Sequence, residues 1–360
     1  MNKEINDREV RRILILQLGG IGDLVLCMPA IVAIRRKYNR SYIALLVMDR
    51  SAQLISGSSY MDEVFALNIQ NTGLKNLFFG GSFFRVCAVI MKLRRKKFDM
   101  SVNLENIASW KGALKMALLF WIIGSRHKVG RDTDRKGFFL NMKSPESLKA
   151  PTHEVNADLK VASLLNASLS PVSFELPISE EHRRFVKEFL KRHNISDNDT
   201  VIGFNPGGFH KSKRWPNQNW SALAHSILKE FKCKIIITEH KNDLETIEGI
   251  STDISDAGTI IARDFNLKQL AALTARFDIF ITNDSGPMHI AAAMGIPVIA
   301  LFGPQDPNRF SPCQLTAKCI VLQKQTRCKT QCNIAGCRKR ICMKLITVED
   351  VLEAIRRLLG

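Results

Sequence analysis

The chain has 360 residues, is 46% hydrophobic and carries a formal charge of +18. This length predicts two domains, and the apolar content is ample for their cores. No apolar run is long enough to cross a bilayer, and the charged first residues are unlike a secretory signal, so we expect a cytoplasmic protein.

Strands and helices alternate along the first half of the chain. The pattern predicts strands over 12–18, 41–48, 61–65 and 98–104, with helices over 24–38 and 83–96. Because this alternation is typical of a parallel sheet covered by helices, we expect a doubly wound α/β domain over residues 1–172.

A glycine-rich turn follows the first predicted strand. Gly19, Gly20 and Gly22 allow the chain to turn tightly and to approach a ligand closely. The dinucleotide-binding spacing G-x-G-x-x-G is not met, and Asp23 in the first helical turn would repel a phosphate placed there. We therefore interpret Asp23 as a proton-accepting carboxylate; the alternative is that it only stabilises the helix N-terminus through the dipole.

The second half of the chain repeats this plan. It predicts strands over 200–205, 233–238, 277–282 and 297–302, with helices over 180–193, 217–231, 267–275 and 347–359. We expect a second doubly wound domain over residues 173–345. The closing segment, residues 346–360, is predicted to form a helix that packs back on the first domain.

A basic loop follows the strand at 200–205. Lys213 and Arg214 can neutralise a leaving diphosphate, and Pro216 fits the opening of the next helix. The alternative is a solvated basic loop without a ligand.

The segment Thr282-Asn283-Asp284-Ser285-Gly286-Pro287-Met288-His289 is the most informative part of the chain. A strand, a tight polar turn and the start of a helix follow one another. Asp284 or Ser285 can cap this helix, Gly286 lets the backbone approach a ligand, and His289 lies on the first turn. Free N–H groups at a helix start bind phosphate, so the segment predicts a diphosphate-bearing substrate at the carboxyl end of the sheet.

The basic residues cluster in the first half of the chain. The clusters lie at 35–37, 92–97 and 126–136, and the apolar stretches 77–84 and 117–123 lie in the same half. Basic and apolar residues together favour an anionic membrane surface as a partner. Neither a stacking-aromatic pattern nor zinc-finger spacing is present, so we expect no specific nucleic-acid partner.

Nine cysteines are present, and in a chain without a secretory signal we expect them to be reduced. Cys328, Cys332, Cys337 and Cys342 have a spacing that can hold zinc, but the usual C-x2-C pairs are absent, so we predict no metal. Asp132-Thr133-Asp134 matches a D-x-D metal motif of some sugar-nucleotide enzymes. It stands among basic residues, which favours salt bridges instead.

Three segments together resemble glycosyltransferase family nine, the bacterial lipopolysaccharide heptosyltransferases. They read ILILQLGGIGDLVLCMPAI, GFNPGGFHKSKRWPNQNW and FITNDSGPMHIAAAMGIPVIALFGPQDP. Their order and spacing also fit, and the resemblance spans nearly the whole chain.

The resemblance implies a GT-B fold, in which two Rossmann-like domains face a central cleft. It also implies inverting transfer of a heptose from ADP-heptose to the inner core of a lipopolysaccharide precursor, without a cofactor or an obligatory metal. We expect the basic and apolar first half to meet this anionic lipid acceptor, which would make the protein peripheral to the inner face of the inner membrane. Asp23 matches the general base, and Lys213 matches the lysine on the donor diphosphate. The donor-binding turn of the family corresponds to Asp284, Ser285, Gly286 and His289.

One position departs from the family pattern. The carboxylate expected to hold the ribose after the second-domain strand corresponds to either Glu239 or Asp243. Two alternatives follow: a related glycosyltransferase that uses another nucleotide sugar or acceptor, and a noncatalytic protein that binds polyanions through its charge.

Overall fold

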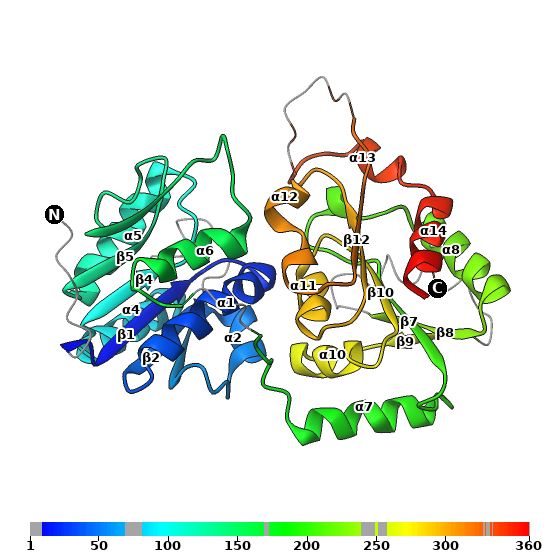
Figure 1. Ribbon diagram of the computed structural model, residues 1–360, viewed down its shortest axis with the longest axis horizontal. Helices are drawn as coiled ribbons and strands as arrows, with labels where there is room; N and C mark the ends of the chain where they lie inside the picture. Colours follow the sequence, from blue (N-terminus) through cyan, green and yellow to red (C-terminus); the bar gives the residue numbers. More distant parts are fainter. Residues whose placement is uncertain are drawn as a thin grey trace. The chain divides into compact units, whose positions relative to one another are not determined.

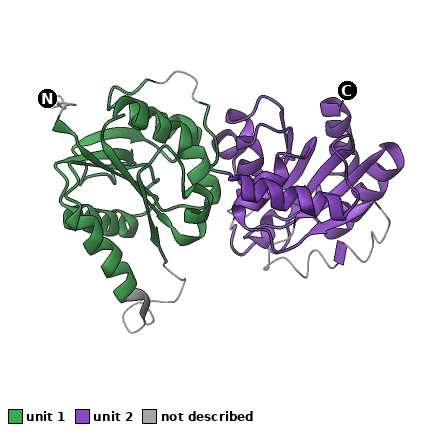
Figure 2. Ribbon diagram, turned by 90° about the horizontal axis from the view of Figure 1, so that it is seen from below, with its two compact units in different colours: residues 1–177 green, residues 178–360 purple. Residues whose placement is uncertain are grey.

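The computed structural model describes residues 9–68, 81–168, 173–238, 249–250, 258–326, 328, 332 and 334–359. The chain divides into two compact units, Met1–Pro177 and Ile178–Gly360, coloured green and purple in Figure 2. The division falls five residues after the junction predicted between residues 172 and 173.

The first unit is built on a parallel sheet of six described strands in the order β3-β2-β1-β4-β5-β6. Its elements are β1 (Arg12–Gln17), α1 (Ile21–Lys37), β2 (Tyr42–Met48), α2 (Asp49–Ile55), β3 (Glu63–Leu67), α4 (Gly81–Arg95), β4 (Met100–Asn103), α5 (Trp110–Ile123), β5 (His127–Thr133), β6 (Met142–Glu146) and α6 (Glu154–Ser163). Helices α1 and α6 pack together over one face of the sheet, and α4 and α5 cover the other face (Figure 1). The central strands are buried on both faces, which is why they read as continuous apolar runs.

The second unit has a parallel sheet of six described strands in the order β12-β11-β10-β7-β8-β9. Its elements are α7 (Glu180–Arg192), β7 (Thr200–Asn205), the 3₁₀ turn η2 (Lys211–Lys213), α8 (Asn217–Glu230), β8 (Cys233–Thr238), β9 (Thr259–Ala262), α10 (Leu267–Thr274), β10 (Ile279–Asn283), α11 (Gly286–Ala293), β11 (Val298–Phe302), α12 (Pro307–Phe310), the 3₁₀ turn η4 (Pro312–Gln314), β12 (Cys319–Gln323), α13 (Ile341–Lys344) and α14 (Val348–Leu359). Helices α7, α10 and α11 line one face, and α8 and α14 line the other (Figure 1). The predicted doubly wound architecture is therefore confirmed for each half of the chain.

The closing helix differs from its prediction. Val351, Leu352 and Ile355 on α14 are buried in the same hydrophobic cluster as Trp220 and Ile227 of α8. The apolar stripe of α14 is thus covered within the second unit, and the predicted packing on the first domain is corrected.

The described cysteines also depart from expectation at one place. Cys313 and Cys319 form a disulfide across the short connection between η4 and β12, so the expectation that every cysteine is reduced is wrong for this pair. In the described part of the chain, no helix combines the length and the apolar character needed to cross a membrane.

Both sheets place the first strand of the unit in the centre. Strand β1 pairs with β2 on one side and β4 on the other, and β7 pairs with β8 and β10. The winding of the chain reverses at β1/β4 and at β7/β10, and loops leaving such a pair diverge and open a crevice at the carboxyl edge of the sheet. These two switch points are where ligands bind in folds of this class.

Candidate active site

Asp23 lies at the switch point of the first unit, on the first turn of α1. Its Oδ2 atom accepts a hydrogen bond of 2.7 Å from the Gly20 N–H, which fixes the carboxylate over the helix start. A Cβ atom on Gly19 would lie 2.6 Å from the same oxygen, so a larger residue there would displace the Asp23 carboxylate. The glycine-rich turn therefore serves to place a carboxylate.

A second carboxylate, Glu105, lies in the loop that follows β4. Its Oε2 atom is buried and has no hydrogen-bond partner in the described residues. Burial and, next, the negative charge of Asp23 raise the pKa of Glu105 to about 7. Glu105 was not predicted from the sequence, although it follows β4 as the Gly19–Asp23 turn follows β1, at the adjacent strand of the switch point.

A buried ion cluster lies next to these two carboxylates. The Arg131 guanidinium on β5 is 1% exposed and contacts Glu146 at 2.6 Å, Glu154 at 2.5 Å and Asp158 at 3.2 Å. Burial raises the pKa of Asp158 well above its ordinary value, while the charge of Arg131 opposes the shift. The negative charges of Glu105 and Asp23 also act on Asp158. The candidate carboxylates therefore lie within a strongly negative, partly neutralised environment.

In the second unit, Lys213 and Asp284 come together at the β7/β10 switch point. The Lys213 Nζ atom lies 2.9 Å from Asp284 Oδ2, and the two side chains are 14% and 6% exposed. Burial raises the pKa of Asp284, and the charge of Lys213 opposes that rise. His210, in the same loop as Lys213, has a pKa lowered by burial and by the Lys213 charge.

Two asparagine side chains tie these loops to each other. The Asn283 amide donates to the Pro206 and Gly207 carbonyls, and its oxygen accepts from the Trp215 N–H. The Asn205 amide donates to Ser285 Oγ at 3.0 Å. The loop that carries Lys213 is thus held in place by residues at the ends of β7 and β10, a framework that the sequence analysis did not identify.

The other predicted donor-binding residues lie at the start of α11. Ser285 is the N-terminal flanking residue, but its side chain makes no capping hydrogen bond to the helix, so the predicted side-chain cap at Ser285 is wrong. Gly286 begins the helix, and His289 is buried on its first turn. The Arg214 guanidinium donates two hydrogen bonds to the Gly208 carbonyl and braces the loop.

Some predicted features lie elsewhere. Glu239 and Asp243, the predicted ribose contacts, fall outside the described residues. In the D-x-D motif, Asp134 lies 3.4 Å from Lys136 in the expected salt bridge. Asp132 accepts from the Gly137 N–H instead. In the described part of the chain, no group of three His, Cys, Asp or Glu side chains is arranged to hold a metal ion. The free cysteines at 328, 332, 337 and 342 form no such group either.

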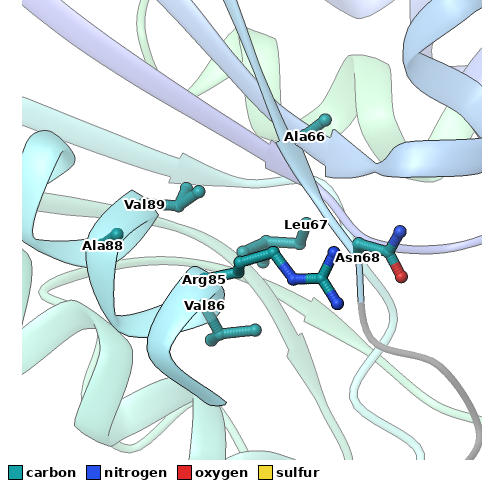
Figure 3. Close-up of a pocket in the computed structure, with 7 residues that line it drawn as sticks. All are labelled: Ala66, Leu67, Asn68, Arg85, Val86, Ala88 and Val89. Carbon is teal, nitrogen blue, oxygen red and sulfur yellow. The ribbon is translucent and has the colours of Figure 1, made fainter. Parts of the chain in front are cut away.

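A separate hollow of about 240 Å³ lies between the end of β3 and α4 (Figure 3). It is lined by Ala66, Leu67, Asn68, Arg85, Val86, Ala88 and Val89. None of the candidate residues lines it, so it does not belong to either switch point.

Comparison with known proteins gives relatives over most of the chain. The chain is 25% identical over 304 residues to the lipopolysaccharide core heptosyltransferase OpsX of Haemophilus influenzae, covering 83% of this chain and 80% of the relative. It is 23% identical to lipopolysaccharide heptosyltransferase 2 of Escherichia coli, covering 86% and 88%.

Two solved structures share the fold. A family 9 glycosyltransferase from Veillonella parvula superposes with a TM-score of 0.77 at 24% identity, covering 97% of both chains. The ADP-heptose heptosyltransferase II of Escherichia coli gives a TM-score of 0.73 at 24% identity, covering 97% of this chain and 98% of the other. The two Rossmann-like units are accordingly those of a GT-B fold, as predicted.

Glycosyltransferase family 9 (heptosyltransferase) matches residues 86–338, which is well over half of the chain. This span includes Glu105, Arg131, Lys213 and the Asp284–His289 turn. The chain therefore belongs to glycosyltransferase family 9, the heptosyltransferase family, and is a transferase.

Proposed function

We propose that this chain transfers a heptose from ADP-heptose to the inner core of a lipopolysaccharide precursor, with inversion at the sugar carbon and Asp23 as general base. The observation that carries the proposal is the pairing of functional side chains at both switch points. Asp23 and Glu105 stand at β1/β4, and Lys213 and Asp284 stand at β7/β10. The named relatives, which are lipopolysaccharide heptosyltransferases, support the choice of sugar and pathway.

In the proposed reaction, Asp23 accepts the proton of the acceptor hydroxyl. The freed oxygen forms a bond to the anomeric carbon as the bond from that carbon to the diphosphate oxygen breaks. The Gly20 N–H, 2.7 Å from Asp23 Oδ2, orients the carboxylate for this role. Attack opposite the leaving group inverts the configuration of the sugar carbon.

Lys213 and the start of α11 are assigned to the departing ADP. The positive end of the α11 dipole and the Lys213 ammonium stabilise the charge that develops on the diphosphate. Asp284 holds the ammonium at 2.9 Å, so this cation is in position before the donor binds. Ser285, Gly286 and His289 stand beside it as the proposed donor-binding turn.

The proposal is tested with Asp23→Asn and Lys213→Ala, assayed with ADP-heptose and a lipid-free core acceptor. Losing one positioned group of this kind costs about a hundred- to a thousand-fold in rate. Asp23→Asn is expected to lose turnover and keep ADP affinity, whereas Lys213→Ala is expected to lose both. An active Asp23→Asn enzyme would remove the base assignment.

Each variant has a matched control. Asp49 lies in the first turn of α2, so Asp49→Asn removes an acid from a comparable helix start in the same unit. Lys211 shares the η2 turn with Lys213 but is exposed, so Lys211→Ala removes a neighbouring positive charge. Both controls should retain turnover. A thermal-shift panel of nucleotide sugars then tests the identity of the donor. If a different nucleotide sugar stabilises the protein and ADP-heptose does not, that sugar nucleotide replaces ADP-heptose as the proposed donor.

A further inference from the structure

Helix α5 exposes an unusual apolar stripe. Trp110, Leu114, Leu118 and Trp121 are 59%, 62%, 56% and 71% exposed. Their spacing places them on one side of the helix. The opposite side is also apolar and packs into the first unit through Ala113, Met116, Leu119, Phe120 and Ile123. The helix is therefore apolar on both sides, and only one of these sides is covered by the described protein.

Further exposed apolar side chains lie beside the stripe and on the neighbouring helix. Phe138 is 50% exposed and stacks on Trp110 with 6.4 Å between ring centroids. Helix α4 packs beside α5 and presents exposed Phe84 and Met91. Contiguous exposed patches of large apolar side chains are rare on monomeric proteins and mark interaction sites.

The charges in the segment that contains the stripe are mostly positive. Between residues 81 and 126 the sequence has nine Lys or Arg residues and two Asp or Glu residues. Neither α4 nor α5 contains an acidic residue, and Lys111 and Lys115 lie on α5 itself. A large apolar face bordered by cations complements an anionic lipid surface better than it complements nucleic acid, which offers no hydrocarbon layer.

We propose that α5 is the membrane-docking helix of this chain, and that its stripe of Trp110, Leu114, Leu118 and Trp121 enters the interface of an anionic phospholipid bilayer. The helix has 14 residues and is about 21 Å long, shorter than the hydrocarbon core of about 30 Å, so it lies in the plane of the interface. The two tryptophans suit this depth because their rings are apolar and their N–H groups stay in contact with water. The docking of α5 on the bilayer is independent of the proposed reaction. The expectation that the bilayer carries the lipid-linked acceptor rests on the proposed function.

The tryptophans of the chain provide a direct test. Of the four, Trp110 and Trp121 are on the stripe, whereas Trp215 and Trp220 are fully buried in the second unit. Vesicles of phosphatidylcholine mixed with phosphatidylglycerol should shift the tryptophan fluorescence emission to shorter wavelength, and brominated lipid should quench this fluorescence. In the double variant Trp110→Phe with Trp121→Phe the vesicles should still bind the protein in flotation, but the spectral response should disappear.

The decisive variant is Leu114→Ser combined with Leu118→Ser. Both positions are exposed, so the fold is retained, and we expect vesicle affinity to fall roughly ten-fold or more because interfacial binding scales with buried apolar area. The matched control is Leu345→Ser with Leu359→Ser, which removes two exposed leucines from the second unit and should leave vesicle binding unchanged. Lys111→Gln with Lys115→Gln should weaken binding mainly at low salt.

Three results would overturn the proposal. One is absence of binding to anionic vesicles, and another is equal loss of binding in the Leu345/Leu359 control. The third is a dimer in sedimentation that dissociates in the Leu114/Leu118 variant, because the stripe would then be covered by a second copy of the chain. Failure of the docking proposal is separable from failure of the proposed reaction: the Leu114/Leu118 variant should transfer sugar normally to a lipid-free acceptor and slowly to a vesicle-embedded one.

Discussion

The Lys213 ammonium and the Asp284 carboxylate form a buried ion pair, with 2.9 Å between Nζ and Oδ2. The two residues are far apart in the sequence and meet because β7 and β10 are adjacent strands. If one partner is removed, the remaining charge is buried without compensation and lowers the free energy of unfolding, because burial penalises the ionised form of either group.

A double-mutant cycle on this pair should reveal strong coupling. Asp284→Asn or Lys213→Met alone is expected to destabilise the second unit by about 3 kcal/mol, because each leaves an uncompensated charge. The double variant should cost clearly less than the sum of the single variants. Urea unfolding followed by Trp215 and Trp220 fluorescence measures all three values, and strict additivity would contradict the coupling.

The same ion pair predicts that the stability of a Lys213 variant depends on pH. Burial raises the pKa of Asp284, and Lys213 holds that rise back. Without the lysine the carboxyl binds its proton more tightly in the folded state than in the unfolded state, so stability falls as pH rises. The stability loss of Lys213→Met should therefore be smaller at pH 5 than at pH 8.

Gly19→Ala is expected to impair catalysis without impairing donor binding. The new methyl group would lie 2.6 Å from Asp23 Oδ2 and 2.9 Å from Asp23 Cβ, so the carboxylate must move. A misplaced catalytic group costs about a hundred-fold in turnover. ADP affinity, measured by calorimetry, should remain normal. Gly20→Ala is the control, because its methyl group would meet Asp23 Oδ2 at an ordinary 3.4 Å.

Glu105→Gln should change how stability depends on pH. The pKa of Glu105 is raised from 4.5 to about 7, so the folded state holds a proton that the unfolded state releases. Stability in the parent protein is therefore fully present below pH 4.5 and falls as pH rises toward 7, by roughly 3 kcal/mol in total. Glu105→Gln should remove this loss, so it gains stability relative to the parent at pH 8 but not at pH 4.5.

Glu63→Gln is a control of opposite sign for that experiment. Hydrogen bonds from Lys96 and Tyr42 lower the pKa of Glu63, so its contribution is present at neutral pH and is lost on acidification. Calorimetry at several pH values would distinguish the two cases. Parallel pH profiles for the parent and the Glu105→Gln protein would contradict the raised pKa.

Arg131→Lys is predicted to destabilise the first unit despite conserving charge. The guanidinium makes a two-pronged contact with Glu146, from Nε at 2.9 Å and from Nη2 at 2.6 Å, and also contacts Glu154 and Asp158. A lysine has no planar fork and cannot satisfy these carboxylates together. Thermal unfolding should detect the loss, whereas Arg135→Lys at an exposed position should have little effect.

The sequence predicted the architecture well because the central strands are buried on both faces and read as apolar runs. The sequence did not predict strands in which charged side chains are buried in ion pairs. Strand β5 carries His127, Lys128, Arg131 and Asp132, and the buried Arg131 is neutralised by residues from β6 and α6. Such compensation is a tertiary property that no local pattern reveals. Strand β12 was missed as well, and it lies at the sheet edge with only partly buried side chains.

The candidate site could be predicted where a glycine or proline marked a turn beside a polar residue. Asp23, Lys213 and Asp284 were all found in this way, and their catalytic and binding roles stay predictions. Glu105 was not predicted, and Asn283 was quoted within its segment without a role, because the importance of both depends on which strands are neighbours. The sequence pattern indicates helix α5 only as a short apolar run at 117–123, because a helix with apolar residues on two opposite sides lacks a clear amphipathic period.

Each hydrophobic cluster of described residues lies wholly within one of the two units. Two separate cores can melt at different temperatures, so a single midpoint does not define the stability of the whole chain. The tryptophans divide in the same way: the buried pair reports on the second unit, and the exposed pair of the first unit changes environment little on unfolding. A fluorescence melt would therefore overlook damage to the half of the enzyme that holds Asp23, and calorimetry is needed to detect it.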